Sequence, residues 1–436
     1  MPALDQAPED RAHHQRLLGL IAEEIHAAGG VLGFDRFMEL ALYAPGLGYY
    51  VAGLPKLGAS GDFVTAPEIS PLFGRCLATQ YQEVRAALGG GDLLEFGAGS
   101  GALAVDLLAE LAHRDALPER YLILEPSPDL QARQRETIAE RLPEQGHRVQ
   151  WLTTLPDGFQ GVVIANEVLD AMPVHRFCID EDGVPAEIFV VLDEAGDGAA
   201  YDGADDAGKE KVEGASEGAG EETDEALVEQ VGSPRSKGLQ NAVLALQARG
   251  LALEPGYSSE VNLRLAPWMR ALAGAVERGL VLIIDYGYPR REYYHPQRRA
   301  GTLISHHQHQ AKAALFARLG LQDISAHVDF SAVADAAIAA GLTLAGYSTQ
   351  ANFLIGCGLD QHMMDALAGA IDPHQQMRIS AGARQLVLPA AMGERFQVIG
   401  FGRGLERPWR GFGVRDLRAR LEVTKHATQS RAGLSE

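Results

Sequence analysis

The order of hydrophobic and polar positions alternates between two patterns through the middle of the chain. Short apolar runs at residues 92–96, 121–124 and 162–165 are typical of strands that are buried on both faces of a sheet. The segments between these runs place apolar residues three or four positions apart, as amphipathic helices do. Strand and helix therefore alternate, which predicts an α/β fold with a parallel sheet.

The alternation is interrupted and then resumes toward the C-terminus. Residues 266–278 have helical spacing before a strand at 280–285, and residues 331–340 and 342–347 repeat the pattern. Residues 395–402 predict one more strand, which no helix connects onward.

Segments outside the alternating region follow other patterns. Residues 1–90 predict an N-terminal helical cap with a loop that faces substrate or cofactor, and residues from about 174 to 192 alternate as a β-hairpin does. The expected organisation is a cap at 1–90, an α/β domain at 91–410 that contains the hairpin and an acidic insert at 193–235, and a polar tail at 411–436.

The acidic insert carries most of the net charge. Between Asp193 and Glu229 there are 14 acidic residues against the two bases Lys209 and Lys211, so this segment supplies −12 of the formal charge of −20. Its Gly, Ala, Asp and Glu composition cannot bury enough apolar surface to order, which predicts a solvated, disordered linker. Collection of a basic substrate is the functional alternative. The remaining −8 argues against nucleic acid as a partner, because such binding needs clustered Lys and Arg.

The cysteines and the N-terminal residues indicate the cellular compartment in which the protein is expected. Cys76, Cys178 and Cys357 are widely spaced and form no C-x-x-C motif, so neither a disulfide framework nor a zinc site is indicated. Residues 1–15 are acidic and lack the apolar segment of a signal peptide. Since no run of about 18 apolar residues occurs, we expect no membrane insertion. These features predict a cytoplasmic protein.

The turn after the first core strand is the most informative motif. Residues 95–101 read Glu-Phe-Gly-Ala-Gly-Ser-Gly and lead into a helix. Glycines allow a sharp turn and close approach of a ligand, and the following helix N-terminus offers free N–H groups. Glu95 would repel a pyrophosphate and attract a sulfonium or ammonium group. The turn favours S-adenosylmethionine, although Gly97, Gly99 and Ala102 also fit the dinucleotide pattern of an NAD enzyme.

The next two core strands end in polar groups. Glu125 ends the second strand, where a doubly wound sheet places the carboxylate that holds ribose hydroxyls. Both candidate cofactors carry that ribose. Asn166, Glu167 and Asp170 follow the third strand, at the edge where open α/β sheets bind ligands. A hydride-transfer site has no evident use for two acids there.

The chain resembles the MidA-like methyltransferases in five motifs that occur in the same order. These are Gly-Asp-Phe-Val-Thr-Ala-Pro-Glu-Ile-Ser at 61–70, the glycine turn at 95–101, Asn-Glu-Val-Leu-Asp-Ala-Met-Pro at 166–173, Ile-Asp-Tyr-Gly-Tyr at 284–288 and Ala-His-Val-Asp-Phe at 326–330. Mitochondrial members of this family assist the assembly of respiratory complex I. The resemblance implies a class I methyltransferase fold, with a Rossmann-like sheet of seven strands and an antiparallel last strand. It also implies S-adenosylmethionine-dependent methyl transfer to a protein nitrogen, with arginine as the expected acceptor.

The resemblance assigns the cofactor to Glu95, Gly97, Gly99, Gly101 and Glu125. It implies that Glu95 lies near the charged part of S-adenosylmethionine and that Glu125 takes the ribose, while the glycine backbone contacts the methionine end. The structural alternatives are a turn with an unrelated acid at Glu95 and a charge at a helix N-terminus for Glu125.

An arginine acceptor requires help from carboxylates, since the guanidinium pKa is above ~12 and the protonated group is a poor nucleophile. Glu167 and Asp170 are three residues apart, and on a helical turn they would share a face. We expect them to clamp the guanidinium by bidentate hydrogen bonds, with Asn166 at the boundary between cofactor and substrate. The alternative is an N-cap at Asn166 and two first-turn charges.

Two other functions stay open from the sequence. One is methyl transfer to a small molecule, and the other is a non-catalytic, cofactor-binding assembly factor for a respiratory complex. A protein substrate, with a complex I subunit as the candidate, is the partner that the resemblance implies. No metal is expected, because His306, His307 and His309 lack a companion Glu or Cys at ligand spacing.

Overall fold

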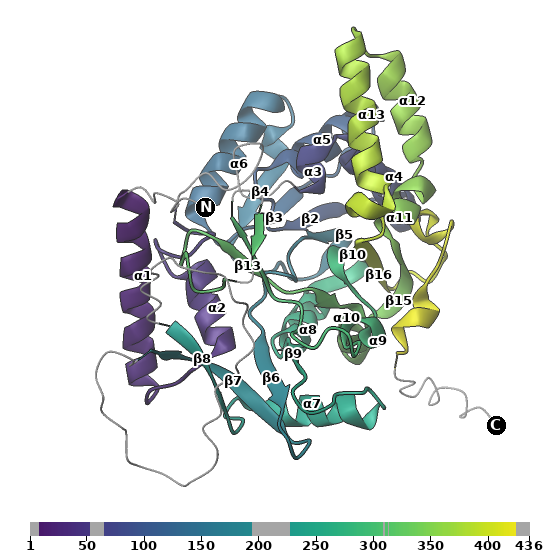
Figure 1. The fold of residues 1–436 in the computed structure, drawn as a ribbon. Helices are drawn as coiled ribbons and strands as arrows, with labels where there is room; N and C mark the ends of the chain where they lie inside the picture. The colour runs from purple at the N-terminus through teal and green to yellow at the C-terminus, as the bar shows by residue number, and fades with distance from the viewer. Residues whose placement is uncertain (1–7, 53–64, 194–226, 308–309, 313, 424–436) are drawn as a thin grey trace, which may run out of the picture.

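The computed structural model describes residues 8–52, 65–193, 227–307, 310–312 and 314–423. Its centre is an eight-stranded sheet in which seven strands follow the order β15, β16, β10, β5, β2, β3, β4, and the two-residue strand β14 (Val328–Asp329) pairs with the end of β10 (Figure 1). The seven strands are β2 (Asp92–Phe96), β3 (Tyr121–Leu124), β4 (Val149–Leu152), β5 (Phe159–Asn166), β10 (Val276–Tyr288), β15 (Thr343–Thr349) and β16 (Phe396–Arg403).

Strand directions in this sheet confirm the expected fold class. Neighbouring strands from β4 to β10 are parallel, whereas β16 is antiparallel to both of its neighbours, β10 and β15. The last strand of the chain is therefore inserted, in reverse, between two strands that precede it. Strand β4 was not predicted, because its four residues are too few to show a period.

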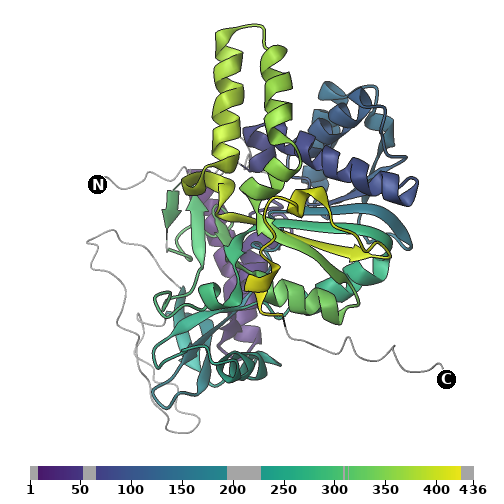
Figure 2. The ribbon, with the colours of Figure 1, turned by 90° about the vertical axis from the view of Figure 1, so that its right-hand side faces the viewer.

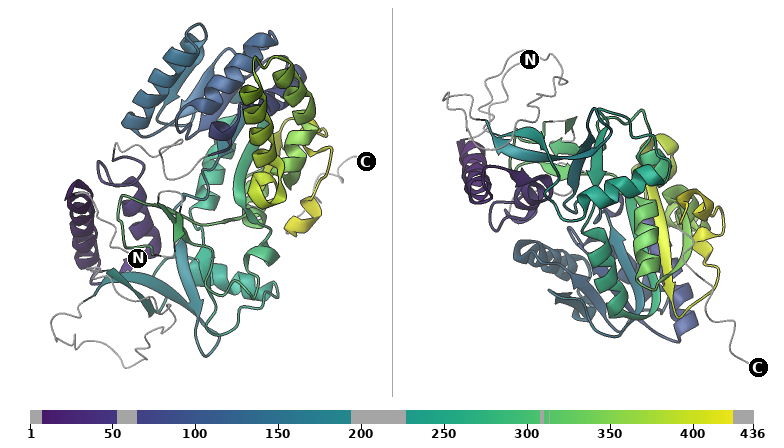
Figure 3. Two further views of the ribbon diagram at one scale, coloured as in Figure 1. Left: turned by 45° about the horizontal axis from the view of Figure 1, so that its top comes forward. Right: turned by 90° about the horizontal axis from the view of Figure 1, so that it is seen from below.

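Helices cover both faces of the sheet, which makes a three-layer domain (Figure 3). Alternate side chains of the central strands, such as Leu93 and Ile164, pack toward α4 (Leu72–Leu88), α5 (Ala102–His113) and α6 (Pro128–Arg141). The intervening side chains, such as Leu94 and Val163, pack toward α8 (Leu265–Ala275) and α10 (Phe330–Ala339). Both faces are buried, which explains why the strands read as continuous apolar runs.

A second sheet joins the N-terminal helices to the inserted hairpin. Strands β6 (His175–Ile179) and β7 (Pro185–Leu192) pair as the expected antiparallel hairpin. The rest of this sheet is β1 (Leu32–Gly33), β8 (Leu227–Gly232) and β9 (Ser258–Val261). Helices α1 (Pro8–Ala27) and α2 (Phe34–Tyr43) pack on one side and α7 (Leu239–Ala248) on the other.

Strand β8 corrects the extent of the acidic insert. Disorder was expected to residue 235, but residues 227–232 pair with β7 along its length, and Leu227 is buried. The acidic composition of the preceding segment masked this short apolar run. Residues 194–226, which include most of the predicted insert, lie outside the described residues.

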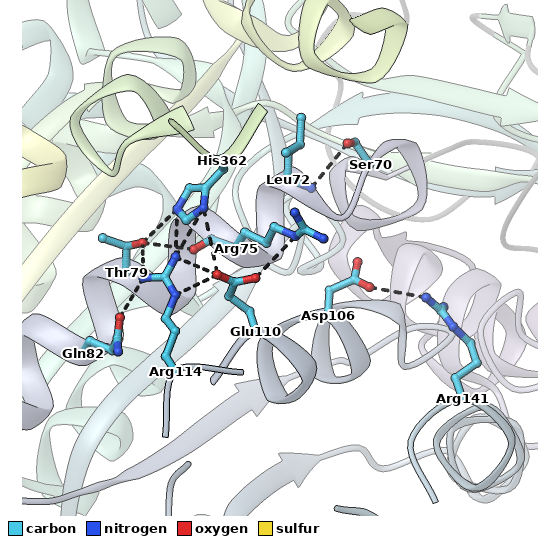
Figure 4. Close-up of polar contacts among 10 residues, drawn as sticks. All are labelled: Ser70, Leu72, Arg75, Thr79, Gln82, Asp106, Glu110, Arg114, Arg141 and His362. Atoms are coloured by element: carbon cyan, nitrogen blue, oxygen red, sulfur yellow. Dashed lines mark hydrogen bonds and ion pairs between the residues drawn. The ribbon is translucent and has the colours of Figure 1, made fainter. Parts of the chain in front are cut away.

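Three helices after β15 have no counterpart in the sequence-based expectation. They are α11 (Gln350–Gly356), α12 (Leu359–Ala368) and α13 (Pro373–Val387), and the last two form a hairpin that projects from the domain (Figure 2). At the base of α12, His362 lies 2.9 Å from Oγ1 of Thr79 in α4, and it contacts Arg114 at the end of α5 (Figure 4).

Smaller elements complete the chain. They are α3 (Ala66–Ile69), α9 (Arg290–Tyr293), and a three-stranded sheet of β11 (Ile304–His307), β12 (Gln310–Lys312) and β13 (Asp323–Ser325). The first part of the predicted polar tail is packed, since Phe412 and Leu421 are buried in short 3-10 turns. The apolar residues of this segment stand singly between charged ones, so they show no helical or strand period that would predict packing. Residues 424–436 lie outside the described residues.

Candidate functional site

The glycine turn adopts the backbone conformation that its composition predicts. Gly97, Gly99 and Gly101 have φ angles of 58°, 54° and 86°, a left-handed region that other residues rarely enter. Gly101 is the N-cap residue of α5. The N–H of Gly97 donates to the carbonyl of Leu124 at the end of β3, 3.1 Å away, which joins the ends of two neighbouring strands.

A cavity of about 330 Å³ opens at the carboxyl ends of β2, β3 and β5. This size is within the range of small-molecule sites, and the position is where open α/β sheets bind ligands. Six of the eight predicted site residues line it: Glu95, Gly97, Gly99, Glu125, Asn166 and Glu167. The other two, Gly101 and Asp170, do not form part of its wall.

Glu95 is a buried acid in the floor of the cavity. Its carboxylate accepts a hydrogen bond of 2.7 Å from the hydroxyl of Tyr121 in β3. Burial, together with repulsion from Glu125, raises the pKa of Glu95 to about 7, although the Tyr121 bond lowers it. The group is thus half ionised near neutral pH, and a cationic ligand would favour its charged form.

Glu125 is tied to the glycine turn through a residue that the sequence analysis missed. Oε2 of Glu125 accepts a bond of 3.1 Å from Nε2 of Gln134 in α6, and the same nitrogen lies 3.1 Å from the carbonyl of Gly99. Trp151 in β4 donates to the other amide atom of Gln134. Gln134 is fully buried, so it fixes the two sides of the cavity relative to each other. A single glutamine in a polar helix carries no sequence signal for this role.

The N-terminal segment also reaches the cavity. Tyr43, Tyr50 and Glu68 line it, and Glu68 accepts a short hydrogen bond from Ser100 of the glycine turn. The rings of Tyr43 and Tyr50 are stacked, with centroids 5.5 Å apart. Glu68 belongs to the motif at 61–70, which the sequence analysis quoted without assigning a role. The first four residues of that motif lie outside the described residues.

Asn166 is the last residue of β5, and Glu167 and Asp170 follow the strand in a segment that is not helical. Glu167 has a φ of 53°, which is unusual for a residue with a side chain. Its carboxylate accepts a bond of 3.0 Å from Asn166 and another from the N–H of Ala66 in α3. The shared helical face is therefore wrong, because a tight turn replaces the expected helix.

Asp285 in β10 holds this turn. One carboxylate oxygen accepts bonds from the N–H groups of Leu169, at 2.9 Å, and of Asp170, at 3.2 Å. The next residue, Tyr286, donates from its hydroxyl to Oδ2 of Asp170 over 2.6 Å. Both residues belong to the quoted motif at 284–288, but the sequence did not predict their contacts with Asp170.

The three carboxyl groups influence one another. Burial and the neighbouring acid Asp170 raise the pKa of Glu167 to about 8. Burial raises the pKa of Asp170 to about 6, against the lowering effect of the Tyr286 bond. The pKa of Asp285 lies well above its ordinary value because of burial and repulsion by both other acids. We call Glu167, Asp170 and Asp285 the acid cluster.

His327 and Asp329 belong to the quoted motif at 326–330, and their side chains contact different residues. Asp329 caps α10 and lies 3.3 Å from Nε of Arg290, whereas His327 packs against the rings of Tyr286 and Tyr288. Among the described residues, no group of three His, Cys, Asp or Glu side chains could hold a metal ion.

The comparisons with known proteins decide the family. A profile described as "Putative S-adenosyl-L-methionine-dependent methyltransferase" matches residues 72–348, more than half of the chain. The chain belongs to this methyltransferase family. A solved structure from Burkholderia thailandensis, bound to S-adenosyl-homocysteine, is 36% identical with a TM-score of 0.82, and the match covers 95% of this chain and 98% of that one.

Curated relatives extend the comparison. The protein arginine methyltransferase NDUFAF7 of Danio rerio is 28% identical over 88% of this chain and 86% of its own length. The Drosophila melanogaster homologue is also 28% identical, over 92% of this chain and 89% of its own length. Both are named as mitochondrial proteins, and this finding contradicts the cytoplasmic localisation expected from the sequence. No helix within the described ranges has the length and apolar character to cross a membrane.

The enzyme is thus an S-adenosylmethionine-dependent methyltransferase, and its cavity suits that cofactor. Buried Glu95 matches a ligand with positive charge, and the carboxylate of Glu125 can accept from ribose hydroxyls. The family match therefore excludes the NAD enzyme that the glycine pattern had left open.

Proposed function

We propose that this methyltransferase transfers a methyl group to a guanidinium nitrogen of an arginine in a protein. Two unsatisfied acceptors beside the cofactor cavity carry the proposal. Oδ1 of Asp170 and Oδ1 of Asn166 are buried, and within the described residues neither accepts a hydrogen bond of normal geometry, although the backbone N–H groups of Asp170 and Ala171 lie near the Asp170 carboxyl group. A buried polar atom without a partner costs roughly 1–3 kcal/mol. A ligand with several N–H groups would remove that cost.

The charge of the acid cluster supports a cationic acceptor. Within the described residues, none of Glu167, Asp170 and Asp285 forms an ion pair with a lysine or arginine. A guanidinium group is permanently charged and presents five N–H donors in a plane. It would stabilise the ionised carboxylates and fill both open acceptors at once. A neutral small-molecule acceptor would supply no such charge.

The proposed roles follow from these positions. When bound, S-adenosylmethionine supplies an electrophilic methyl group. We propose that Glu167 and Asp170 hold the guanidinium and localise its charge, which leaves one nitrogen lone pair free to react. Asn166 lines the cofactor cavity next to Glu167, at the proposed boundary between cofactor and acceptor.

The proposed cofactor residues are Glu95, Gly97, Gly99, Gly101 and Glu125. Gly101 is not in the cavity wall, so its contribution is conformational. A side chain at this position would enter an unfavourable φ of 86°, and its Cβ would lie 3.5 Å from Cα of Gln134. The turn and α6 therefore approach each other closely at Gly101.

The relatives support a protein substrate, because the curated proteins are named protein arginine methyltransferases. A subunit of respiratory complex I, which the MidA-like resemblance suggests, is the first candidate acceptor. The acid cluster sets no requirement on the rest of that protein beyond an arginine that can enter the site.

Product mass tests the proposal. The purified enzyme is incubated with isotopically labelled S-adenosylmethionine and candidate proteins, and methyl groups are mapped to residues by mass spectrometry. We expect label on arginine, and a roughly 10- to 100-fold loss of rate in Asp170→Asn and Glu167→Gln with cofactor binding retained. Asp92→Asn is the matched control, since this buried acid pairs with Arg120 at the opposite end of β2. Label on lysine or on a small molecule would refute the arginine acceptor.

A further inference from the structure

Asp170 and Tyr286 are joined by a short hydrogen bond inside the acid cluster. The Tyr286 hydroxyl lies 2.6 Å from Oδ2 of Asp170, and the two residues are 116 positions apart in the chain. Tyr286 is itself restrained by edge contacts with His327, at 5.2 Å between ring centroids, and with Phe396, at 5.5 Å. These ring contacts hold the Tyr286 hydroxyl in position to donate to Asp170.

The backbone that carries Asp170 is fixed independently of this side-chain bond. Asp285 binds the N–H groups of Leu169 and Asp170, and the N–H of Ala326 donates to the carbonyl of Asp170 over 3.0 Å. Removing the Tyr286 hydroxyl would leave these backbone contacts in place. The effect of the phenol can thus be separated from the stability of the turn.

We propose that Tyr286 is a positioning residue for the methyl acceptor, because its phenol occupies Oδ2 of Asp170 and leaves Oδ1 directed to the acceptor. This inference rests on the proposed arginine chemistry. The carboxylate has two oxygens, and only one of them has a described side-chain donor. Without the phenol, the carboxyl group could rotate, and either oxygen could be protonated. Tyr286 thereby selects one oxygen and favours its ionised state.

Other ionisable groups near Asp170 oppose the effect of the phenol. Glu167 lies in the same turn, Asp285 lies in β10, and Asp323 in β13 acts on Tyr43 and Tyr50 together with Asp170. All of these acids disfavour a further negative charge. His327, which packs on the other side of the Tyr286 ring, has a pKa lowered to about 4 by burial and is neutral at physiological pH. The donor from Tyr286 is the strongest group that favours the charged form of Asp170, and the backbone N–H groups of Ala171 and Asp170 act in the same direction with smaller effect.

The substitution Tyr286→Phe tests this role, with two measurements. The first is the titration of the Asp170 carboxyl carbon by 13C NMR in aspartate-labelled full-length protein, assigned by its loss in Asp170→Asn. The second is calorimetric binding of Nα-acetyl-argininamide in the presence of S-adenosylhomocysteine from pH 5 to pH 8. Tyr347→Phe is the matched control, because Tyr347 is buried in β15 and no described group bonds to its hydroxyl.

We expect the Asp170 titration to move upward by about one pH unit in Tyr286→Phe and to stay unchanged in Tyr347→Phe. Binding of the arginine derivative should then require a correspondingly higher pH and weaken about fivefold at pH 6, because the ionised fraction of Asp170 falls from about one half to about one tenth. An unchanged NMR titration in a folded Tyr286→Phe protein would overturn the inference. If the wild-type enzyme fails to bind Nα-acetyl-argininamide at any pH, that result counts against the arginine acceptor. The NMR titration of Asp170 then still decides whether Tyr286 sets its charge.

Discussion

The hydroxyl of Tyr121 in β3 donates a 2.7 Å hydrogen bond to the carboxylate of Glu95 in β2, and both side chains are buried. Register places Glu95 opposite Ile123, two residues beyond Tyr121, so the bond crosses from one strand to the next. The bond favours the charged form of an acid that burial would otherwise keep protonated. Glu95 is thereby poised to change its charge near neutral pH.

Replacing Glu95 with glutamine should remove a pH dependence from cofactor binding. Because the pKa of Glu95 is raised to about 7, the carboxyl is mostly protonated at pH 6 and mostly ionised at pH 8. Only the ionised form attracts the cationic cofactor, so wild-type affinity for S-adenosylmethionine should rise over this interval. In Glu95→Gln the affinity should stay flat and be roughly tenfold weaker at pH 8.

Calorimetric titration at the two pH values measures this difference. Tyr121→Phe provides the companion variant, since loss of its hydrogen bond should raise the pKa of Glu95 and move the increase in affinity to higher pH. The same pH dependence in wild type and Glu95→Gln would show that another group controls cofactor binding.

Glu167 should make the free enzyme less stable at alkaline pH. The folded-state pKa is about 8, against an ordinary value of 4.5 in the unfolded chain. Its favourable contribution is fully present below pH 4.5 and is lost as pH rises toward 8, because the unfolded chain ionises first. Glu167→Gln removes this penalty. The thermal midpoint of the variant should match wild type at pH 5 and exceed it at pH 8.

Scanning fluorimetry at several pH values checks this expectation. Functional sites often lower the stability of the free protein, because they hold charged groups in place for a ligand. The more stable Glu167→Gln variant should therefore lose methyl transfer. A parallel decline of both proteins between pH 5 and pH 8 would contradict the assignment to Glu167.

Local patterns predicted the central strands of the fold and the glycine turn that follows β2. The strands around residues 92–96 and 162–165 are buried on both faces, and the glycine turn requires left-handed backbone angles, so each is encoded in adjacent residues. The short strand β4 and the helices α11–α13 were missed, since their boundaries depend on packing against distant elements.

The acceptor side of the site was less predictable for the same physical reason. Asp285 and Tyr286 contact Asp170 across more than 100 residues of chain, and no periodicity reports such a contact. The helical turn expected at Glu167 fails because backbone bonds to Asp285 impose another conformation. Sequence spacing singled out Glu167 and Asp170 as candidates but could not describe their geometry.

Gln134 should be required for the shape of the cofactor cavity. Its amide bridges Gly99, Glu125 and Trp151, and methionine would keep its length but lose all three bonds. We expect Gln134→Met to weaken S-adenosylmethionine binding by roughly tenfold or more, since Glu125 loses a buried donor. Calorimetry measures the affinity, and circular dichroism verifies the fold. Gln247→Met is the control because this glutamine bonds only the distant hairpin carbonyl of Gly183 among the described residues. Equal losses in both variants would argue against a specific bridge.

The projecting hairpin should influence cofactor binding although it does not line the cavity. A Cβ at Gly382 in α13 would lie 2.9 Å from Cβ of Ser70 at the end of α3. Either α13 or the end of α3, where Figure 4 labels Ser70, must therefore move. Helix α3 carries Glu68, which bonds Ser100 of the glycine turn. Gly382→Ala should therefore displace α3, lower stability by about 1–3 kcal/mol and weaken S-adenosylmethionine binding severalfold.

A second substitution distinguishes this coupling from simple damage to the hairpin. Ser70→Gly removes the atom that the new methyl group would meet, so the double variant should recover most of the affinity lost in Gly382→Ala. Gly369→Ala, in the same hairpin, places its Cβ no closer than 3.6 Å to another atom and should bind cofactor as wild type does. Affinity and thermal midpoint are measured for all of these proteins. Ser70→Gly alone is measured as well, because it also removes the hydroxyl that accepts a hydrogen bond from the N–H of Leu72 over 3.3 Å. If the double variant recovers neither affinity nor thermal midpoint relative to Ser70→Gly alone, the contact between α13 and α3 does not transmit the effect.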